Sequence, residues 1–174
     1  MDLIEKFAYC PVCGTPHFEQ NSPKSKRCAN CGFEYFMNPA AAVVALITDG
    51  SGRLLVERRR LEPAKGTLDL PGGFADVLET AEDAVAREVR EETGLTVTGS
   101  RYLFSLPNIY RYSGLDVHTL DMFFACTADD ITCLRAGDDA AECRWIAAGD
   151  IHTEQFGLRS VREGLRLYLK TSRM

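Results

Sequence analysis

The sequence predicts a mixed α+β protein in which helices pack around a mixed sheet, preceded by a small metal-binding ribbon. Three observations lead to this prediction. Short apolar runs of β type alternate with turn signals between residues 40 and 146. An amphipathic segment with start and stop signals lies among them, at about residues 80–93. Two cysteine pairs stand near the N-terminal end. With 174 residues, the chain has room for one ordinary domain and a small appendage.

The β-type runs follow one another along the chain. Residues 40–48 are apolar, residues 49–52 form a turn, and residues 54–56 are expected to pair back on the first run as a hairpin. Further strands are expected near residues 95–106, 117–127 and 142–146. A closing helix is predicted by apolar side chains at helical spacing, which are Leu158, Val161, Leu165, Tyr168 and Leu169.

The amphipathic segment at 80–93 has the features of a capped helix. Thr80 is placed to cap its first turn, with Asp83 three residues later to answer it. Gly94 can end the helix in the left-handed conformation. A buried face is predicted by apolar side chains at four-residue steps, which are Ala81, Val85 and Val89.

Three carboxylates are expected on one side of this helix. Glu88, Glu91 and Glu92 stand at positions i, i+3 and i+4. They repel one another by roughly 0.2–0.5 kcal/mol per exposed pair, and by more where water is scarce. A divalent cation removes that cost, and ligands that are all oxygen suit Mg²⁺ or Mn²⁺. Because Glu92 falls between Ala81 and Val85 on a helical wheel, we expect a half-sheltered metal site.

Neighbouring residues are placed to support these carboxylates. Arg87 lies one turn before Glu91 and can form an ion pair with it. Gly72 and Gly73 let the backbone approach a phosphate or a metal closely. Three glutamates at this spacing are by themselves typical of a solvated acidic helix. In register with Gly73, Glu79, Arg87 and Gly94, they instead predict a metal site.

Four of the seven cysteines lie in two CxxCG motifs. Four thiolates at this spacing predict a closed tetrahedral Zn²⁺ site of the structural type. The ligands would be Cys10, Cys13, Cys28 and Cys31. Two disulfides are the alternative, and a cytoplasmic chain disfavours them. The other cysteines lack such spacing and are expected to be buried or incidental thiols; they are Cys126, Cys133 and Cys143.

Residues 1–36 are expected to form the ribbon and residues 37–174 the second domain. Phe33, Tyr35 and Phe36 are expected to form the small core of the ribbon. The ribbon can brace the second domain, help to make a homodimer or touch a nucleic acid. Its few basic residues are interpreted as a solvated loop; they are Lys24, Lys26 and Arg27.

Net charge and the distribution of apolar residues exclude some kinds of partner. The net charge of −5 argues against broad binding to a nucleic-acid backbone. No apolar run approaches the roughly twenty residues needed to span a bilayer. The first residues lack the basic start and the apolar run of a signal peptide, so we expect a cytoplasmic protein without a membrane partner.

Residues 73–95 resemble the signature of the Nudix hydrolases at every fixed position. Gly73 and Glu79 are separated by five residues, and seven more precede the run Arg-Glu-Val-Arg-Glu-Glu-Thr-Gly-Leu at 87–95. The resemblance implies an α/β/α sandwich and an enzyme dependent on Mg²⁺ or Mn²⁺. Such an enzyme hydrolyses the pyrophosphate bond of a nucleoside diphosphate joined to another group and gives phosphomonoesters. It also implies that Glu88, Glu91 and Glu92 hold the cation, helped by a carbonyl of Gly72 or Gly73.

Other site residues follow from the same resemblance. A general base is expected among the glutamates of the signature or in the later acidic stretch at 138–145, where Glu142 is preferred and Asp139 is second. A solvated acidic turn is the alternative for that stretch. Arg58 matches the place of a phosphate-facing arginine. Glu79 and Arg87 complete the catalytic set.

A four-cysteine ribbon before such a domain resembles the NADH pyrophosphatase branch. That branch cuts NADH or NAD, and some members remove dinucleotide caps from RNA. Its Ser-Gln-Pro-Trp motif reads Ser-Leu-Pro-Asn at 105–108 here, and its Ala-Gly-Phe reads Gly-Gly-Phe at 72–74. The expected substrate is NADH, NAD, ADP-ribose or a similar small nucleotide derivative, and the only nucleic acid expected is a capped RNA end. Candidates to stack on a base are Phe74, Tyr110 and Tyr112.

Two other uses of the fold are alternatives. The first is a regulator that binds a nucleotide derivative without cutting it and touches nucleic acid or protein through its ribbon. The intact signature argues against it. The second is isopentenyl diphosphate isomerase chemistry, which needs histidine ligands that three scattered histidines do not supply.

Overall fold

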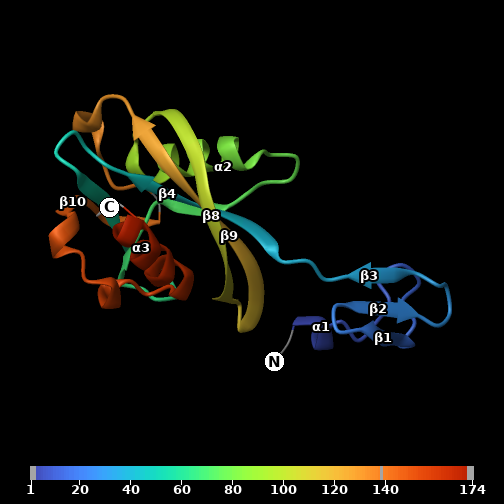
Figure 1. The fold of residues 1–174 in the computed structure, drawn as a ribbon. Coiled ribbons are helices and arrows are strands. Elements are labelled where there is room, and N and C mark those ends of the chain that lie inside the picture. Colours follow the sequence, from blue (N-terminus) through green and yellow to red (C-terminus); the bar gives the residue numbers. More distant parts are fainter. Residues whose placement is uncertain (1–2, 138, 172–174) are drawn as a thin grey trace. The chain divides into compact units, whose positions relative to one another are not determined.

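The computed structural model describes residues 3–137 and 139–171, so Asp138 of the acidic stretch lies outside the described residues. The chain forms two compact units (Figure 1). The first unit extends to Pro39 and also includes Ile109–His118. The second consists of Ala40–Asn108 and the chain from Thr119 onward.

The first unit is a small antiparallel ribbon. After a short helix α1 (Leu3–Lys6), three strands pair in the order β1-β2-β3. Their bounds are β1 Phe18–Ser22, β2 Ser25–Cys28 and β3 Glu34–Phe36. Cys10, Phe18 and Cys28 form the core, and Phe33 packs against it. The expectation that Tyr35 and Phe36 also belong to this core is wrong, because they are 37% and 48% exposed. A ribbon this short has no second layer to cover both faces of β3.

The second unit contains two sheets. The larger is a mixed sheet in the order β7-β4-β9-β8, in which β4 runs parallel to β9 and antiparallel to β7. Its strands are β4 Ala40–Ile47, β7 Gly72–Phe74, β8 Val97–Tyr112 and β9 Leu115–Ala128, and the parts of β8 and β9 within Ile109–His118 belong to the first unit. The smaller sheet is antiparallel in the order β10-β5-β6. Its strands are β5 Arg53–Arg59, β6 Leu68–Asp69 and β10 Ala140–Ala147.

Two helices cover opposite faces of the mixed sheet (Figure 1). Val43 and Ala45 of β4 pack with α2 (Ala81–Thr93), whereas Val44 and Leu46 pack on the side of α3 (Arg159–Thr171). Successive residues of a strand face opposite sides, so β4 has helices on both sides. The expected sandwich of helices around a mixed sheet is confirmed. No helix in the described residues is long and apolar enough to cross a membrane.

Three short 3₁₀ helices occupy the connections around β10. They are η1 Ile131–Cys133, η2 Ala148–Asp150 and η3 Thr153–Gln155.

The expected hairpin of residues 40–48 and 54–56 is wrong. β4 and β5 belong to different sheets and share only one bridge, between Thr48 and Leu54. The turn between them exists: the Asp49 carboxylate accepts from the backbone N–H groups of Ser51 and Arg53 at 2.9 and 2.8 Å. Because β4 is apolar on both sides, it lies between β7 and β9 in the sheet that has helices on both faces.

The predicted caps of α2 are present. The Thr80 hydroxyl accepts from the backbone N–H of Asp83 at 3.1 Å. Gly94 follows the helix with φ of 72°, and its N–H donates to the carbonyl of Arg90 at 3.0 Å. Val85 and Val89 are fully buried, as the apolar spacing predicts.

A buried polar network joins α3 to the mixed sheet. Asp121 of β9 accepts from Asn108 Nδ2 at 3.1 Å, and from the hydroxyls of Thr119 and Ser160 at 2.5 Å each. All four side chains are at least nine-tenths buried. Ser160 lies in the first turn of α3, where the helix dipole also favours a carboxylate. The network therefore fixes the start of α3 against β9.

Replacing Asp121 is expected to destabilise the second unit. Asp121→Ala leaves three buried donors without their acceptor, and each such donor costs roughly 1–3 kcal/mol. We expect the free energy of unfolding to fall by at least about 2 kcal/mol in urea denaturation. Asp150→Ala, at an exposed position, should stay within about 0.5 kcal/mol of the wild type. Equal effects of the two substitutions would contradict a structural role for the network.

Candidate active site

The backbone of β7 lies directly against the acidic side of α2. A Cβ atom at Gly73 would come within 2.5 Å of Glu88 Oε1, and one at Gly72 would lie 2.1 Å from the carbonyl oxygen of Val43. Gly72 therefore requires glycine, because the obstacle is backbone, whereas a side chain at Gly73 would displace the Glu88 carboxylate. The Gly72 N–H donates to Glu92 Oε2 at 2.8 Å. These close approaches hold the inner carboxylates of α2 beside the Gly72–Gly73 backbone.

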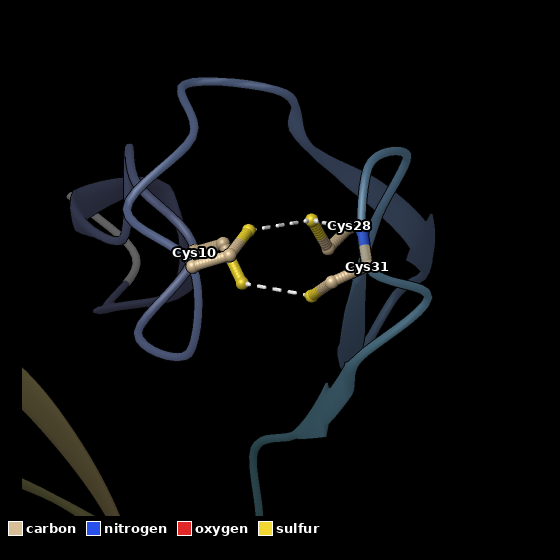
Figure 2. Close-up of side chains that lie close together, drawn as sticks. Cys10, Cys28 and Cys31 are labelled. Atoms are coloured by element: carbon tan, nitrogen blue, oxygen red, sulfur yellow. Dashed lines mark hydrogen bonds between the residues drawn. The ribbon is translucent and has the colours of Figure 1, made fainter.

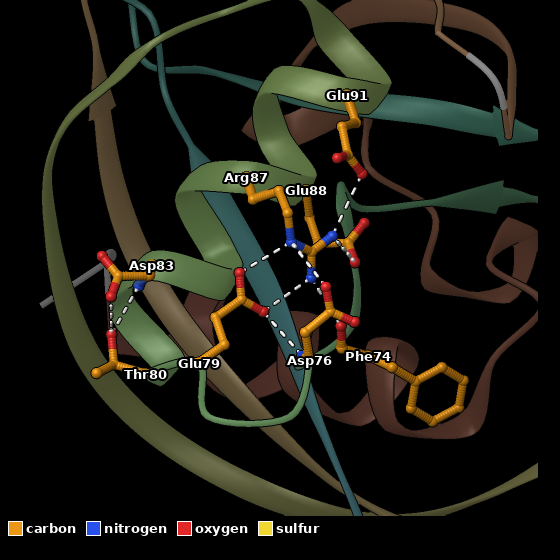
Figure 3. Close-up of polar contacts among 8 residues, drawn as sticks. All are labelled: Phe74, Asp76, Glu79, Thr80, Asp83, Arg87, Glu88 and Glu91. Atoms are coloured by element: carbon orange, nitrogen blue, oxygen red, sulfur yellow. Dashed lines mark hydrogen bonds and ion pairs between the residues drawn. The ribbon is translucent and has the colours of Figure 1, made fainter.

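Arg87 is the centre of an ion-pair network on the outer edge of the site (Figure 3). Its guanidinium binds both oxygens of Glu79, at 2.8 and 3.0 Å. The same group donates to Glu88 at 2.9 Å, to Glu91 at 3.2 Å and to the carbonyl of Phe74 at 3.0 Å. The predicted contact with Glu91 is thus present. The pairing with Glu79 is closer and has two hydrogen bonds.

The three carboxylates of α2 lie at different depths. The Glu91 side chain is 59% exposed, that of Glu88 is 14% exposed, and Glu92 is buried. Burial raises the pKa of Glu88 and of Glu92, and the charge of Glu57 raises that of Glu92 further. This graded burial agrees with the half-sheltered edge expected from the helical wheel.

The pKa of Glu79 is shifted in the opposite direction, downwards. Hydrogen bonds from Arg87, and then the one from the backbone N–H of Asp76, lower its pKa to about 2. Glu79 therefore stays ionised and holds Arg87 in place across the loop between β7 and α2 (Figure 3).

A second group of charges lies behind α2. On β5, Leu55 packs in the core under α2, so the alternate residues Glu57 and Arg59 face the same side. In the strand register Glu57 lies opposite Asp69 of β6 and Cys143 of β10. The guanidinium of Arg59 binds Asp69 Oδ2 at 2.5 Å.

Glu57 is the most isolated of these charges. It is 3% exposed, and its Oε2 is the one buried side-chain N or O atom without a hydrogen-bond partner among the described residues. Burial raises its pKa to about 8, and the charges of Asp69, Asp139 and Glu88 add to this effect. Sequence reasoning missed Glu57; the signal that could have found it was a charged residue at an alternate position of a buried strand.

Arg58 lies on the other face of β5. Its Nε is 3.4 Å from Glu142 Oε2, and its Nη1 donates to the carbonyl of Gly66 at 2.7 Å. Both Arg58 and Arg144 line a cavity of about 370 Å³ on the side of η3. The structure thus brings the candidates Arg58 and Glu142 together, on the face of β5 opposite to Glu57.

Asp139 lies in a loop that is hydrogen-bonded to the C-terminal end of α2. Before it, the N–H of Gly137 donates to the carbonyl of Glu92 at 2.7 Å, and that of Arg135 to the carbonyl of Thr93 at 2.9 Å. After it, the N–H of Arg60 donates to the Asp139 carbonyl at 2.9 Å. A Cβ atom at Gly137 would lie 1.9 Å from the carbonyl oxygen of Glu91, so this contact requires glycine. The sequence did not single out Gly137.

The aromatic candidates belong to different units. Phe74 is 40% exposed, and its ring is directed away from Arg87 (Figure 3). Tyr110 and Tyr112 belong to the first unit; Tyr112 is 62% exposed and Tyr110 is half-buried.

The four cysteines of the ribbon converge on one point, and Figure 2 labels three of them, Cys10, Cys28 and Cys31. Their sulfur atoms all lie within 4.8 Å of one another. The Sγ atoms of Cys10 and Cys31 are 3.7 Å apart, and those of Cys13 and Cys28 are 3.6 Å apart. Sulfurs about 2.3 Å from a tetrahedral Zn²⁺ would be about 3.8 Å apart, whereas a disulfide needs about 2.05 Å. The arrangement therefore fits a zinc ion and does not fit disulfides.

The ion pair of Glu79 with Arg87 should make stability depend on pH. The folded pKa of Glu79 is about 2, below its ordinary value of 4.5, so the pair contributes fully above about pH 4.5 and is lost as the pH falls towards 2. Urea unfolding of wild type and Glu79→Gln should differ most near pH 7 and little near pH 2. Glu163→Gln removes an exposed pair with Arg159 and serves as the control. A difference that is the same at both pH values would refute this assignment.

Comparison with known proteins agrees with this geometry. The NUDIX domain family matches residues 37–165. A NAD-capped RNA hydrolase NudC of Deinococcus radiodurans is 29% identical over 155 residues, covering 87% of this chain and 52% of that protein. An ADP-ribose pyrophosphatase of Methanocaldococcus jannaschii is 36% identical over 116 residues, covering 66% of this chain and 65% of that protein. The chain thus spans between about half and two thirds of the length of these relatives.

A solved structure supports the same fold. The crystal structure of a NUDIX hydrolase from Nitrosomonas europaea matches with a TM-score of 0.73 at 20% identity, covering 95% of this chain and 92% of that one. The family match over residues 37–165, which is most of the chain, shows that this protein belongs to the Nudix hydrolase family.

Proposed function

We propose that this protein hydrolyses the pyrophosphate bond of a nucleoside diphosphate joined to another group, with Mg²⁺ or Mn²⁺ as the cofactor. The observation that carries this proposal is the set of carboxylates at graded depth on α2, held beside the Gly72–Gly73 backbone. The relatives act on related substrates by name: one is an NAD-capped RNA hydrolase and another an ADP-ribose pyrophosphatase. The expected substrates are NADH, NAD, ADP-ribose and NAD-capped RNA ends.

The donor set fits a divalent cation. Glu88, Glu91, Glu92 and the carbonyl of Gly72 offer only oxygen, as Mg²⁺ and Mn²⁺ prefer. Among the described residues no three carboxylates have oxygens within 4.8 Å of one another, and Arg87 binds both Glu88 and Glu91. Mg²⁺ is usually held by one or two carboxylates with water and phosphate oxygens. When bound, the cation supplies positive charge to the diphosphate and lowers the pKa of a water molecule.

The protein's own groups then have distinct roles. Glu92 and Glu88 hold negative charge in a sheltered place, and Glu91 does so at the solvent edge. Arg87, fixed by Glu79, keeps Glu88 and Glu91 in position. Their different roles account for the different burial of Glu88, Glu91 and Glu92.

We assign the general base to Asp139 in preference to Glu142. Asp139 lies two residues after Gly137, whose N–H donates to the Glu92 carbonyl at 2.7 Å, and the charge of Asp139 contributes to the raised pKa of Glu57. Glu142 is paired with Arg58 on the other face of β5. This reverses the preference drawn from the sequence. Arg58, together with Arg144, is placed to hold a distal part of the substrate in the cavity beside η3.

Substrate choice is assigned to aromatic side chains. Phe74 follows Gly73 and offers an exposed ring for stacking on a base. Tyr110 and Tyr112 stay candidates for the same role. Asn108 occupies a position of the motif typical of NADH pyrophosphatases, but it is buried and donates to Asp121. We therefore assign Asn108 to structure rather than to substrate contact.

The cysteine cluster is proposed to hold one structural Zn²⁺. Besides the spacing of the sulfur atoms, the N–H of Cys31 donates to Cys28 Sγ at 3.3 Å, and Asn30 Nδ2 donates to Cys13 Sγ at 3.6 Å. Such donors stabilise thiolates. With a core of three buried residues, the ribbon depends on the ion for its fold.

The proposed activity can be tested with a substrate panel in Mg²⁺ and Mn²⁺, comprising NADH, NAD, ADP-ribose and NAD-capped RNA. We expect release of phosphomonoesters, and Glu92→Gln should reduce kcat at least about 100-fold, since even outer partners of a metal site contribute 10–100-fold. Asp139→Asn should reduce kcat by about 10²- to 10⁴-fold. Glu142→Gln is the matched control and should keep kcat within a few fold.

Two outcomes would overturn this proposal. Binding of these nucleotides without any turnover would favour a regulator that senses its ligand. A larger loss of kcat in Glu142→Gln than in Asp139→Asn would return the base to Glu142.

Zinc binding makes a separate prediction. The purified protein should contain about one Zn²⁺ per chain by elemental analysis, and Cys28→Ser should lose it together with the amide protection of residues 18–36 in hydrogen exchange. Cys133→Ser, an exposed cysteine outside the cluster, should keep both. Zinc content unchanged in Cys28→Ser would rule out the four-sulfur site.

A further inference from the structure

Glu57 carries a feature that the proposed function leaves unexplained. Its side chain is buried in the second unit, yet Oε2 has no hydrogen-bond partner among the described residues. A buried carboxylate oxygen without a partner is costly, and native proteins leave few of them. A positive or hydrogen-bonding group bound next to Glu57 would remove this cost.

The surroundings of Glu57 are acidic. Its strand partners are Asp69 on one side and Cys143 on the other. Asp69 is already occupied, because its Oδ2 accepts from Arg59 and its Oδ1 from the N–H of Leu70. The Cys143 thiol donates to the carbonyl of Glu92 at 3.6 Å. Glu57 thus lies beneath the end of α2 that carries Glu92.

Glu92 is the buried carboxylate at this end of α2. One of its carboxylate oxygens, Oε2, accepts from the N–H of Gly72 at 2.8 Å. Cys143, opposite Glu57 in the strand register, donates to the Glu92 carbonyl at 3.6 Å, and the charge of Glu57 raises the pKa of Glu92. Arg87 does not serve this pair, since it binds Asp76, Glu79, Glu88, Glu91 and the carbonyl of Phe74.

We propose that Glu57 is a ligand of a divalent cation that it shares with Glu92, in a deep site between β5 and the C-terminal half of α2. Two carboxylates with water or phosphate oxygens are a sufficient set for Mg²⁺ or Mn²⁺. The site deepens the proposed function and rests on it, because it assigns an additional ligand to the same acidic centre. Arg59 hydrogen bonds to Asp69 and its charge also favours the ionised form of Glu57, whose Oε2 has no hydrogen-bond partner among the described residues.

The test uses Mn²⁺ alone as the probe, on the full chain. Binding is followed by electron paramagnetic resonance of free Mn²⁺ and by the rise in melting temperature that Mn²⁺ produces. Glu57→Gln keeps the shape and removes the charge. We expect its Mn²⁺ affinity to fall by about 10- to 100-fold, with a smaller rise in melting temperature. Glu62→Gln, an exposed glutamate after β5, should bind Mn²⁺ like the wild type.

A direct structural measurement makes the result independent of how the variant folds. Wild-type crystals soaked in Mn²⁺ should show an anomalous peak within about 2.0–2.6 Å of a Glu57 carboxylate oxygen. No peak within that distance at saturating Mn²⁺, or unchanged Mn²⁺ affinity in Glu57→Gln, would overturn the proposal and leave Glu57 as a buried acid that keeps its proton.

Failure of the activity would be distinguishable from failure of this site. Mn²⁺ bound at Glu57 without hydrolysis of any nucleotide on the panel would refute the proposed function and support the deep site. Hydrolysis by the wild type, with Mn²⁺ bound only to carboxylates of α2, would refute the deep site and leave the function standing.

Discussion

The close approach of the Gly72–Gly73 backbone to the acidic side of α2 is the constraint on which the site depends. A side chain at Gly73 would occupy the place of the Glu88 carboxylate, and the N–H of Gly72 fixes Glu92. β7 can reach this position because it pairs with β4, whose other face packs on α3. The mixed sheet therefore serves as the rigid support that brings a strand backbone and a helix surface together. The same contact places a backbone carbonyl and several carboxylates on one side of the helix.

Positive charge is divided between two arginines with separate partners. Arg87 faces the outer carboxylates and is itself fixed by Glu79, whereas Arg59 neutralises Asp69 behind the helix. Among the described residues, neither arginine donates to Glu57 Oε2. Repulsion among the outer acids is thus balanced by Arg87, whereas the inner acid Glu57 keeps a carboxylate oxygen without a hydrogen-bond partner among the described residues. This division gives a physical reason why burial raises the pKa of Glu92 while the pKa of Glu79 is lowered.

The sequence was sufficient for the elements whose signals are local. The caps and apolar face of α2, the α3 helix and the gathering of the four cysteines were all predicted from spacing. It was insufficient where partners are distant in the chain. The pairing of β4 with β9 involves strands about eighty residues apart, so β4 and β5 were wrongly expected to form a hairpin. Glu57, Arg59 and Gly137 were missed for the same reason, because their roles depend on which face of a strand or loop meets α2. Tyr35 and Phe36 were wrongly placed in a core because hydrophobicity alone does not show whether a second layer exists.

The contact of Gly137 with α2 limits which parts of the site can change during evolution. Glu92 offers its carboxylate to the site, while its carbonyl accepts from Gly137 and from Cys143. The loop before β10 and the helix are thereby coupled through one residue, and a displacement of either element would carry the other with it. We therefore expect substitutions that adapt the site to a new substrate to leave Gly137 and Glu92 unchanged. They are expected instead at positions without such contacts, such as the exposed Val77 and Leu78 between β7 and α2. Residues that serve catalysis and residues that select the substrate would then change in separate parts of the chain.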